Sequence, residues 1–322
     1  MDGEGREVRK AGVLGDLLNG KVSVPLEVSV QQREVLVSRR WDDGADLCLY
    51  PGDVFDLVRQ IPSQSMQLTV TSPPYNIGKE YERKVDLDEY VRWHREIIYE
   101  AHRVTKEGGS ICWQVGNWVD NSSIIPIDYL LYPIFKELGL TMRNRIVWHF
   151  RHGLHASKRF SGRYEVVMWF TKGEPFTFNL DAVRIPQKYP GKKFHRGPNR
   201  GKPSCNPLGK NPTDVWDIPN VKWNHPEKTE HPAQFPVELI ERLVLALTSE
   251  GEWVFDPFMG VASSAIAALK HRRPFAGAEI DEGYYQTGLE RINLFSQGKL
   301  RLRQMGTPIY EPPERKKKDG LL

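Results

Sequence analysis

Short apolar runs alternate with longer segments of helical period through most of the chain. From Asp86 to Thr105 an apolar residue recurs every three or four positions and Gly108-Gly109 follows, which predicts an amphipathic helix with a glycine stop. Similar segments predict five further helices, at Val54–Gln60, Ile127–Leu138, Val237–Thr248, Ser263–Lys270 and Tyr284–Phe295. The apolar runs predict strands, at Leu47–Tyr50, Gln67–Thr71, Ser110–Val115, Arg145–Phe150, Glu165–Thr171, Trp253–Phe255 and Pro274–Ile280.

The order of these elements indicates the fold class. Strands that alternate with helices are typical of a Rossmann-like α/β fold, with a mostly parallel, twisted sheet flanked by helices. Arg145–Phe150 and Glu165–Thr171 have no helical segment between them, so we expect them to pair antiparallel. The loops after the parallel strands would then meet at one edge of the sheet, where ligands bind in such folds.

Both ends of the chain depart from this pattern. Residues 1–45 carry a short helical pattern near Val13–Leu18 and an alternating stretch at Val22–Val37, and we interpret them as an N-terminal arm. Residues 301–322 contain the run Arg315-Lys316-Lys317-Lys318, which is typical of a flexible, solvated tail.

The longest irregular stretch is also strongly basic. Between Val183 and Lys228 the periodicity disappears, and ten Lys and Arg residues stand against three acidic ones. Such a segment is usually functional or disordered, and Trp216 and Trp223 favour an ordered surface. Basic loops with aromatic residues suit contacts with nucleic acid, and a solvated insertion is the alternative. We therefore divide the chain into an arm (1–45), a first α/β half (46–150), a basic recognition region that includes one core strand (151–228), a second α/β half (229–300) and a tail (301–322).

The composition limits the class of protein. A chain of 322 residues with 39% hydrophobic and 27% charged residues is typical of a globular domain with an inserted module. No apolar run approaches the roughly 20 residues of a membrane span, and the N-terminus lacks a signal-peptide core. Three scattered cysteines argue for the reduced compartment of a cytoplasm and against disulfides or a zinc site. The net charge of +4 permits nucleic-acid binding without demonstrating it.

The stretch Ser72-Pro73-Pro74-Tyr75 follows the strand that ends at Thr71. Its prolines stiffen the loop and leave the carbonyls of Ser72 and Pro73 without helical partners, so that they can accept hydrogen bonds from an NH₂ group. Tyr75 can stack on the ring that carries the amine. The alternative is a Pro-Pro turn beside a core aromatic residue.

A second motif lies between residues 253 and 279. A strand, a turn at Gly260, a helix and a strand that ends in Glu279 follow one another, as in sites for adenosine cofactors. The acid follows the glycine by about the 20 residues that place a carboxylate on ribose hydroxyls. Because the loop lacks the pattern Gly-x-Gly-x-x-Gly, a cofactor with adenosine but without phosphates fits it better.

Together these motifs resemble the bacterial DNA amino-methyltransferases that use S-adenosylmethionine. The tetrapeptide precedes the cofactor loop Asp256-Pro257-Phe258-Met259-Gly260, and the basic stretch lies between them, which is the order of the β class of that family. Lys228–Gln234 resembles the segment before the cofactor helix, and Gly52-Asp53 the acidic turn near the adenine. The resemblance covers roughly residues 46–295 and implies the class I methyltransferase fold.

The resemblance also implies roles for particular residues. The catalytic positions would be Ser72, Pro73, Pro74 and Tyr75. Those that bind S-adenosylmethionine would be Asp53, Thr71, Lys228, His231, Asp256, Phe258, Gly260, Ser263 and Glu279. One departure is Ala262, where the family usually has a second glycine. An alanine there is strained if the position needs φ > 0 and harmless if it lies in the first helical turn, which we expect.

Two parts of the resemblance imply different target bases. Serine at position 72 is associated in this family with N4 of cytosine. The wider context resembles β-class enzymes that act on N6 of adenine, and we give it the greater weight; it comprises Tyr75–Tyr81, His152–His155 and Arg159–Tyr164. No Pro-Cys nucleophile is present, which argues against methylation of a ring carbon.

The partner implied is duplex DNA, from which the target base must be flipped out. We expect phosphate contacts from cations that otherwise serve surface solubility: Lys158, Arg159, Arg163, Lys188, Lys192, Lys193 and Arg196. We expect a homodimer in the bacterial cytoplasm, associated with the nucleoid. His149, His152 and His155 lack Cys or acidic partners at ligand spacing, so no metal is expected. The alternatives are methylation of RNA or protein, and a DNA-binding regulator without activity.

Overall fold

The computed structural model describes residues 22–26, 33–75, 85–120, 123–151, 153 and 155–308. The helix expected near Val13–Leu18, the basic run at residues 315–318, His152 and most of the Tyr75–Tyr81 context lie outside the described residues. Within the described part of the chain, no helix is long and apolar enough to cross a membrane.

The described strands form one ten-stranded sheet and a separate hairpin. Across the sheet their order is β1 (Val22–Leu26), β2 (Arg33–Ser38), β3 (Leu47–Pro51), β12 (Phe275–Glu279), β11 (Val254–Asp256), β4 (Met66–Thr71), β5 (Thr105–Val115), β9 (Tyr164–Thr171), β8 (Thr141–His149) and β10 (Val215–Asp217). The six strands from β2 to β5 in that order are parallel to one another, whereas β1 pairs antiparallel with β2 and β9 pairs antiparallel with β5. As predicted, β8 and β9 pair antiparallel. The hairpin consists of β6 (Asn117–Asp120) and β7 (Ser123–Pro126).

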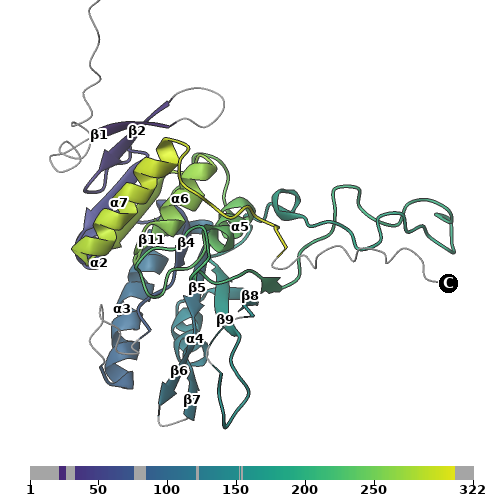
Figure 1. Ribbon diagram of the computed structural model, residues 1–322, viewed down its shortest axis with the longest axis horizontal. Coiled ribbons are helices and arrows are strands. Elements are labelled where there is room, and N and C mark those ends of the chain that lie inside the picture. The colour runs from purple at the N-terminus through teal and green to yellow at the C-terminus, as the bar shows by residue number, and fades with distance from the viewer. Residues whose placement is uncertain are drawn as a thin grey trace, which may run out of the picture.

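Helices cover both faces of the sheet, which confirms the predicted α/β class (Figure 1). One hydrophobic core lies under α5 (Val237–Leu247), α6 (Ser263–Lys270) and α7 (Glu282–Ser296). The other lies under α2 (Val54–Val58), α3 (Leu87–Val104) and α4 (Ile127–Glu137). Strand β3 shows the division, because Leu47 and Leu49 face the first core and Cys48 between them faces the second.

The predicted glycine stop after helix α3 is wrong. The helix begins at its N-cap Asp86, whose side chain accepts from the N–H of Glu89 at 2.9 Å, and it ends at Val104. Thr105 is already extended, and β5 runs through Gly108 and Gly109. Gly108 has φ +75°, and a Cβ atom there would lie 2.5 Å from the carbonyl oxygen of Pro175. Its role is therefore to allow a close backbone approach.

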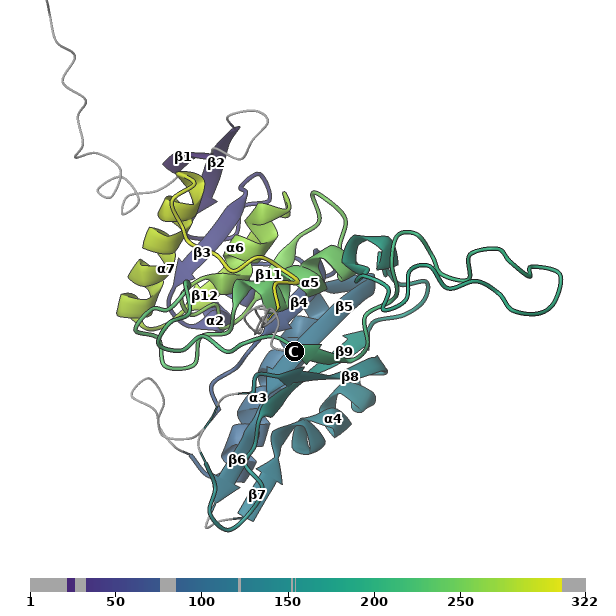
Figure 2. The ribbon, with the colours of Figure 1, turned by 45° about the vertical axis from the view of Figure 1, so that its right-hand side comes forward.

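The basic region is partly built into the sheet. After the 3₁₀ helix η1 (Leu180–Val183), residues 184–210 extend away from the body (Figures 1 and 2), and the chain then returns as β10, which pairs with β8. Trp216 on β10 is 8% exposed and packs in the first core, under the guanidinium of Arg242. Trp223 is 94% exposed, so the expectation that it anchors this region is wrong.

Ala262 also contradicts our expectation. It has φ +62° and ψ 31°, so it is the left-handed N-cap of α6 and not part of the first helical turn. A left-handed residue with a Cβ atom costs roughly 1–2 kcal/mol. The helix itself was predicted with the correct bounds, Ser263–Lys270.

A matched pair of substitutions tests this backbone strain. Ala262 and Ala267 are both fully buried, but Ala267 has the ordinary conformation of a helix interior. We expect Ala267→Gly to lose about 1–2 kcal/mol of unfolding free energy, from helix propensity and a buried methyl. Ala262→Gly should lose at least about 1 kcal/mol less, because relief of the left-handed strain offsets the lost methyl. Urea unfolding measures both, and equal losses would contradict the account.

Candidate functional site

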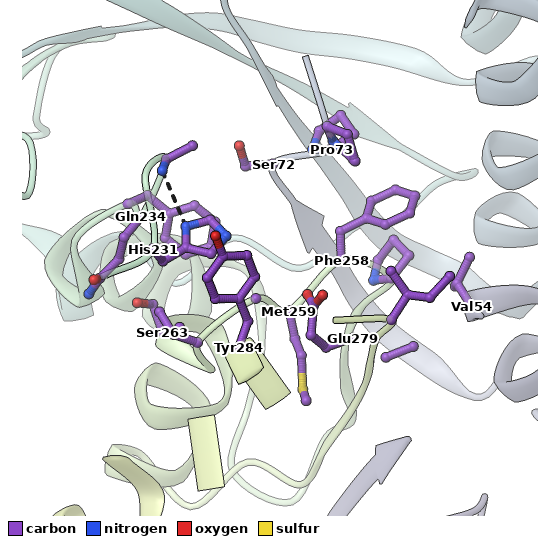
Figure 3. Close-up of a pocket in the computed structure, with 18 of the residues that line it drawn as sticks. Val54, Ser72, Pro73, His231, Gln234, Phe258, Met259, Ser263, Glu279 and Tyr284 are labelled. Carbon is purple, nitrogen blue, oxygen red and sulfur yellow. Dashed lines mark hydrogen bonds between the residues drawn. The ribbon is translucent and has the colours of Figure 1, made fainter. Parts of the chain in front are cut away.

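The carboxyl ends of β3, β4, β11 and β12 meet at one edge of the sheet, and a cleft of about 960 Å³, including its open mouth, lies there. Side chains from all four loops point into it (Figure 3). The predicted residues that line the cleft are Asp53, Ser72, Pro73, Pro74, His231, Phe258, Gly260, Ser263 and Glu279. Thr71, Tyr75, Lys228 and Asp256 do not line it.

Asp256 lies beneath the cleft, fully buried between β4 and α6. One carboxylate oxygen accepts from Thr71 Oγ1 at 2.6 Å and from the N–H of Phe258 at 3.0 Å, and the other accepts from Ser264 Oγ at 2.6 Å. Burial raises the pKa of Asp256 to about 6, although the three hydrogen-bond donors lower it. The carboxyl group therefore ties the strand before the tetrapeptide to the loop that follows β11.

Glu279 lies at the end of β12, where the cleft opens. Its carboxylate accepts from the N–H of Asp281 at 2.8 Å and from the N–H of Gly260. Burial raises the pKa of Glu279 to about 7, and these two donors oppose the shift. Gly260 has φ +50°, which favours glycine at this turn. The acid and the loop are thus joined through the backbone.

The tetrapeptide is fixed by a chain of hydrogen bonds through Tyr75. The phenol Oη lies 2.7 Å from Gln114 Oε1, 3.2 Å from Glu165 Oε2 and 3.0 Å from Ser72 Oγ. Gln114 donates in turn from Nε2 to the same Glu165 oxygen at 2.6 Å. Because Tyr75 has one proton and two purely accepting neighbours, Ser72 donates to the phenol oxygen. The lone pairs of the serine hydroxyl are then left to accept from another group.

The backbone of the tetrapeptide adds further acceptors. The carbonyl of Pro74 accepts from Tyr90 Oη at 2.8 Å. Within the described residues, no hydrogen bond reaches the carbonyls of Ser72 or Pro73.

Burial and the nearby Glu165 carboxylate raise the pKa of Tyr75 well above its usual range, so this side chain stays a neutral hydroxyl.

Several cleft residues had no recognisable signal in the sequence. Trp93 of α3 packs on Phe258 with ring centroids 5.1 Å apart, and Ile280, 71% exposed, lies beside Glu279. Tyr284 of α7 meets His231 edge-on at 4.5 Å. Arg291 is buried outside the cleft lining and donates to two residues that do line it, to the carbonyl of Val261 and, at 3.1 Å, to Ser263 Oγ. Trp93, Tyr284 and Arg291 lie on helices whose pattern indicates only packing, and Ile280 is the residue that follows β12.

The remaining predicted residues lie outside the cleft. Lys228 is exposed, and its ammonium group donates to the carbonyl of Thr229. Lys158, Arg159 and Arg163 belong to the loop between β8 and β9, whereas the other predicted cations lie exposed on the 184–210 extension, at Lys188, Lys192, Lys193 and Arg196. The structure therefore divides the predicted DNA contacts between two loops.

Among the described residues, no group of His, Cys, Asp and Glu could hold a metal ion. His149 instead contacts Asp217, with Nδ1 2.6 Å from Oδ1, and Arg151 contacts the other oxygen of the same carboxylate at 3.1 Å.

The α/β sheet thus brings a Pro-Pro-Tyr loop and a strand-terminal acid to one cleft, at the edge where Rossmann-like folds bind their ligands. The chain belongs to the N6/N4 DNA methylase family, whose model matches residues 66–290. The type II methyltransferase M.BglII of Bacillus subtilis is 49% identical over 237 residues, 73% of this chain and 66% of the relative. The chain therefore spans just under two thirds of that relative.

Two further comparisons give the range of the family. The DNA adenine methyltransferase YhdJ of Escherichia coli is 32% identical over 250 residues, 76% of this chain and 82% of the relative. The solved structure of the cytosine-N4-specific PvuII DNA methyltransferase is 20% identical and has a TM-score of 0.62, covering 79% of this chain and 92% of that one. The latter shows that the fold is shared.

The raised pKa of Glu279 predicts a pH-dependent stability. The folded pKa lies above that of the unfolded chain, so the charged group destabilises the fold above about pH 7, and this effect disappears as the pH falls towards 4.5. Glu279→Gln should therefore match the wild type in stability near pH 4.5 and exceed it by up to about 3 kcal/mol at pH 8. Denaturant unfolding at the two pH values measures this, and a constant difference would contradict it.

Proposed function

We propose that the protein transfers a methyl group from S-adenosylmethionine to an exocyclic amino group of a base in DNA. The observation that carries this proposal is the joining of two sites in one cleft, because Asp256 holds both the tetrapeptide strand and the cofactor loop. Family membership supports the reaction class.

The cleft fits this cofactor. Glu279 can accept hydrogen bonds from the two ribose hydroxyls, and Phe258, Trp93 and Ile280 supply apolar surface for the adenine ring. The turn at Gly260 lets backbone approach the ligand. S-adenosylmethionine supplies a methyl group already activated by its sulfonium, so the protein must mainly orient the acceptor.

The tetrapeptide is suited to activating the amine. The lone pair of an exocyclic amine is delocalised into the ring, which makes the nitrogen a poor nucleophile. Ser72 Oγ and the carbonyl of Pro73 can accept its two N–H bonds and favour a tetrahedral nitrogen, whose lone pair then faces the methyl group. Tyr75 holds the serine proton away from the amine through the Gln114 and Glu165 network. Although Tyr75 does not line the cleft, its ring face remains the proposed stacking surface for the flipped base.

Duplex DNA is the proposed substrate because two basic loops extend from the body and can contact phosphates on either side of a target. A homodimer remains a prediction. A non-catalytic DNA-binding regulator is less favoured, because it would not require the ordered acceptors of the tetrapeptide or a buried acid in the cofactor cleft.

Each target base has an observation in its favour. The wider sequence context predicts adenine, and YhdJ, a relative by sequence, is a DNA adenine methyltransferase. Ser72 favours cytosine, and it is the side chain that meets the amine in the proposed geometry, so here it outweighs the wider context, to which the sequence alone gave the greater weight. We therefore propose N4 of cytosine, with N6 of adenine as the second candidate.

The reaction is tested with labelled S-adenosylmethionine and unmethylated genomic DNA, followed by digestion to nucleosides and mass identification of the product. Wild-type protein should yield N4-methyldeoxycytidine, and N6-methyldeoxyadenosine would show that the wider context decides. If protein that binds S-adenosylmethionine puts no label into either nucleoside, the RNA, protein or regulatory alternatives would be favoured.

Two variants test the roles within the tetrapeptide. Ser72→Ala should lower kcat roughly 100-fold while binding of S-adenosylmethionine stays within a few-fold, because an acceptor specific to the transition state is lost. Tyr75→Phe should have a smaller effect, about ten-fold, since it frees the serine proton without removing the oxygen. A wild-type rate for Ser72→Ala would contradict the mechanism.

A further inference from the structure

The side chain of Phe160 is 99% exposed, more than any other large hydrophobic side chain in the described part of the chain. It lies between Arg159 and Ser161 in the loop that joins β8 to β9, and Lys158, Arg159 and Arg163 surround it in sequence. A single exposed apolar residue is ordinary in a folded protein. Phe160 differs because its loop is attached to the proposed catalytic network.

The loop is attached directly to the proposed catalytic network. The N–H of Phe150 donates to the carbonyl of Arg163 at 3.0 Å, which closes the loop immediately before β9. Glu165, the second residue of β9, lies 3.2 Å from the hydroxyl of Tyr75. Phe160 is five residues from Glu165, so their Cα atoms are at most roughly 17 Å apart. The loop and the β6–β7 hairpin extend together from this edge in both views (Figures 1 and 2).

The loop is also held in shape beside Phe160. The N–H of Ala156 donates to Ser161 Oγ at 3.1 Å, which bridges the residues on either side of Phe160. The guanidinium of Arg163 donates to the carbonyl of Gly162 at 2.8 Å and contacts His155 Nδ1 at 3.4 Å. These bonds hold the loop on both sides of Phe160, whose side chain is exposed.

We propose that Phe160 is a wedge that enters the base stack of duplex DNA when the target base is flipped into the cleft. The proposal rests on the proposed function. An apolar ring inserted at the base step would fill the space that the departing base leaves, and minor-groove proteins insert Phe wedges between base steps. Lys158 and Arg159 would contact the phosphates on either side of the insertion, as their exposure allows.

The test uses duplex oligonucleotides that carry the site mapped from the methylated product. One duplex is fully paired, and in the other the target base faces an abasic position, so that little energy is needed to extrude it. Phe160→Ala should lower kcat/KM on the paired duplex by roughly ten-fold or more and leave the abasic duplex within about two-fold of wild type. Phe160→Leu should restore part of the loss. Since the ring is exposed, the variants should fold.

Two controls separate this role from others. Tyr129→Ala removes a 75% exposed aromatic residue from α4 and should leave both duplexes unaffected. Trp223→Ala removes a second, 94% exposed aromatic residue. Equal losses on both duplexes for Phe160→Ala, no loss on either, or a duplex-specific loss confined to Trp223→Ala would overturn the wedge. Absence of methyl transfer by wild-type protein on every DNA would instead reject the proposed function.

Discussion

The buried carboxylate of Asp256 is the interaction on which the site depends. Asp256 accepts hydrogen bonds from Thr71 of β4, which lies 185 residues earlier in the chain, and from Ser264 of α6. The sheet makes this possible, because β11 pairs in parallel with β4 and places the two strand ends side by side. A buried carboxylate is stable only with such donors. If the two loops moved apart, the carboxylate would be exposed to water or left buried without hydrogen-bond donors.

Three features on the cofactor side of the cleft lower the local stability of the fold. Ala262 is left-handed, Glu279 has its pKa raised by burial, and Nε and Nη2 of buried Arg291 have no hydrogen-bond partner among the described residues. Local strain at one site persists when the surrounding structure over-determines it. Here the two helical layers and the Asp256 bonds provide that support, and the resulting geometry leaves Glu279 and Gly260 facing one ligand space.

Much of the fold and part of the site could be predicted because they depend on local chemistry. Helix α6 has the predicted bounds, and nine predicted site residues line the cleft. The failures depend on tertiary contacts. Gly108 was interpreted as a helix stop, but the constraint on it comes from the backbone of Pro175. The left-handed φ of +62° at Ala262 depends on the residues packed around it, which are distant in sequence. The sequence around Trp223 does not reveal that its side chain is exposed. The Gln114 and Glu165 contacts to Tyr75 join three separate segments and have no short motif.

The most direct test of this account is Thr71→Val, a substitution of similar shape that removes one bond to Asp256. Calorimetry would measure the affinity for S-adenosylmethionine, and single-turnover kinetics on duplex DNA would measure transfer. Because Ser264 and the N–H of Phe258 still hold the loop, affinity should change by less than about three-fold, while transfer should fall at least roughly ten-fold as the tetrapeptide loses its alignment. An unchanged transfer rate, or losses of equal size in affinity and transfer, would contradict the claim that Asp256 aligns the two halves of the cleft.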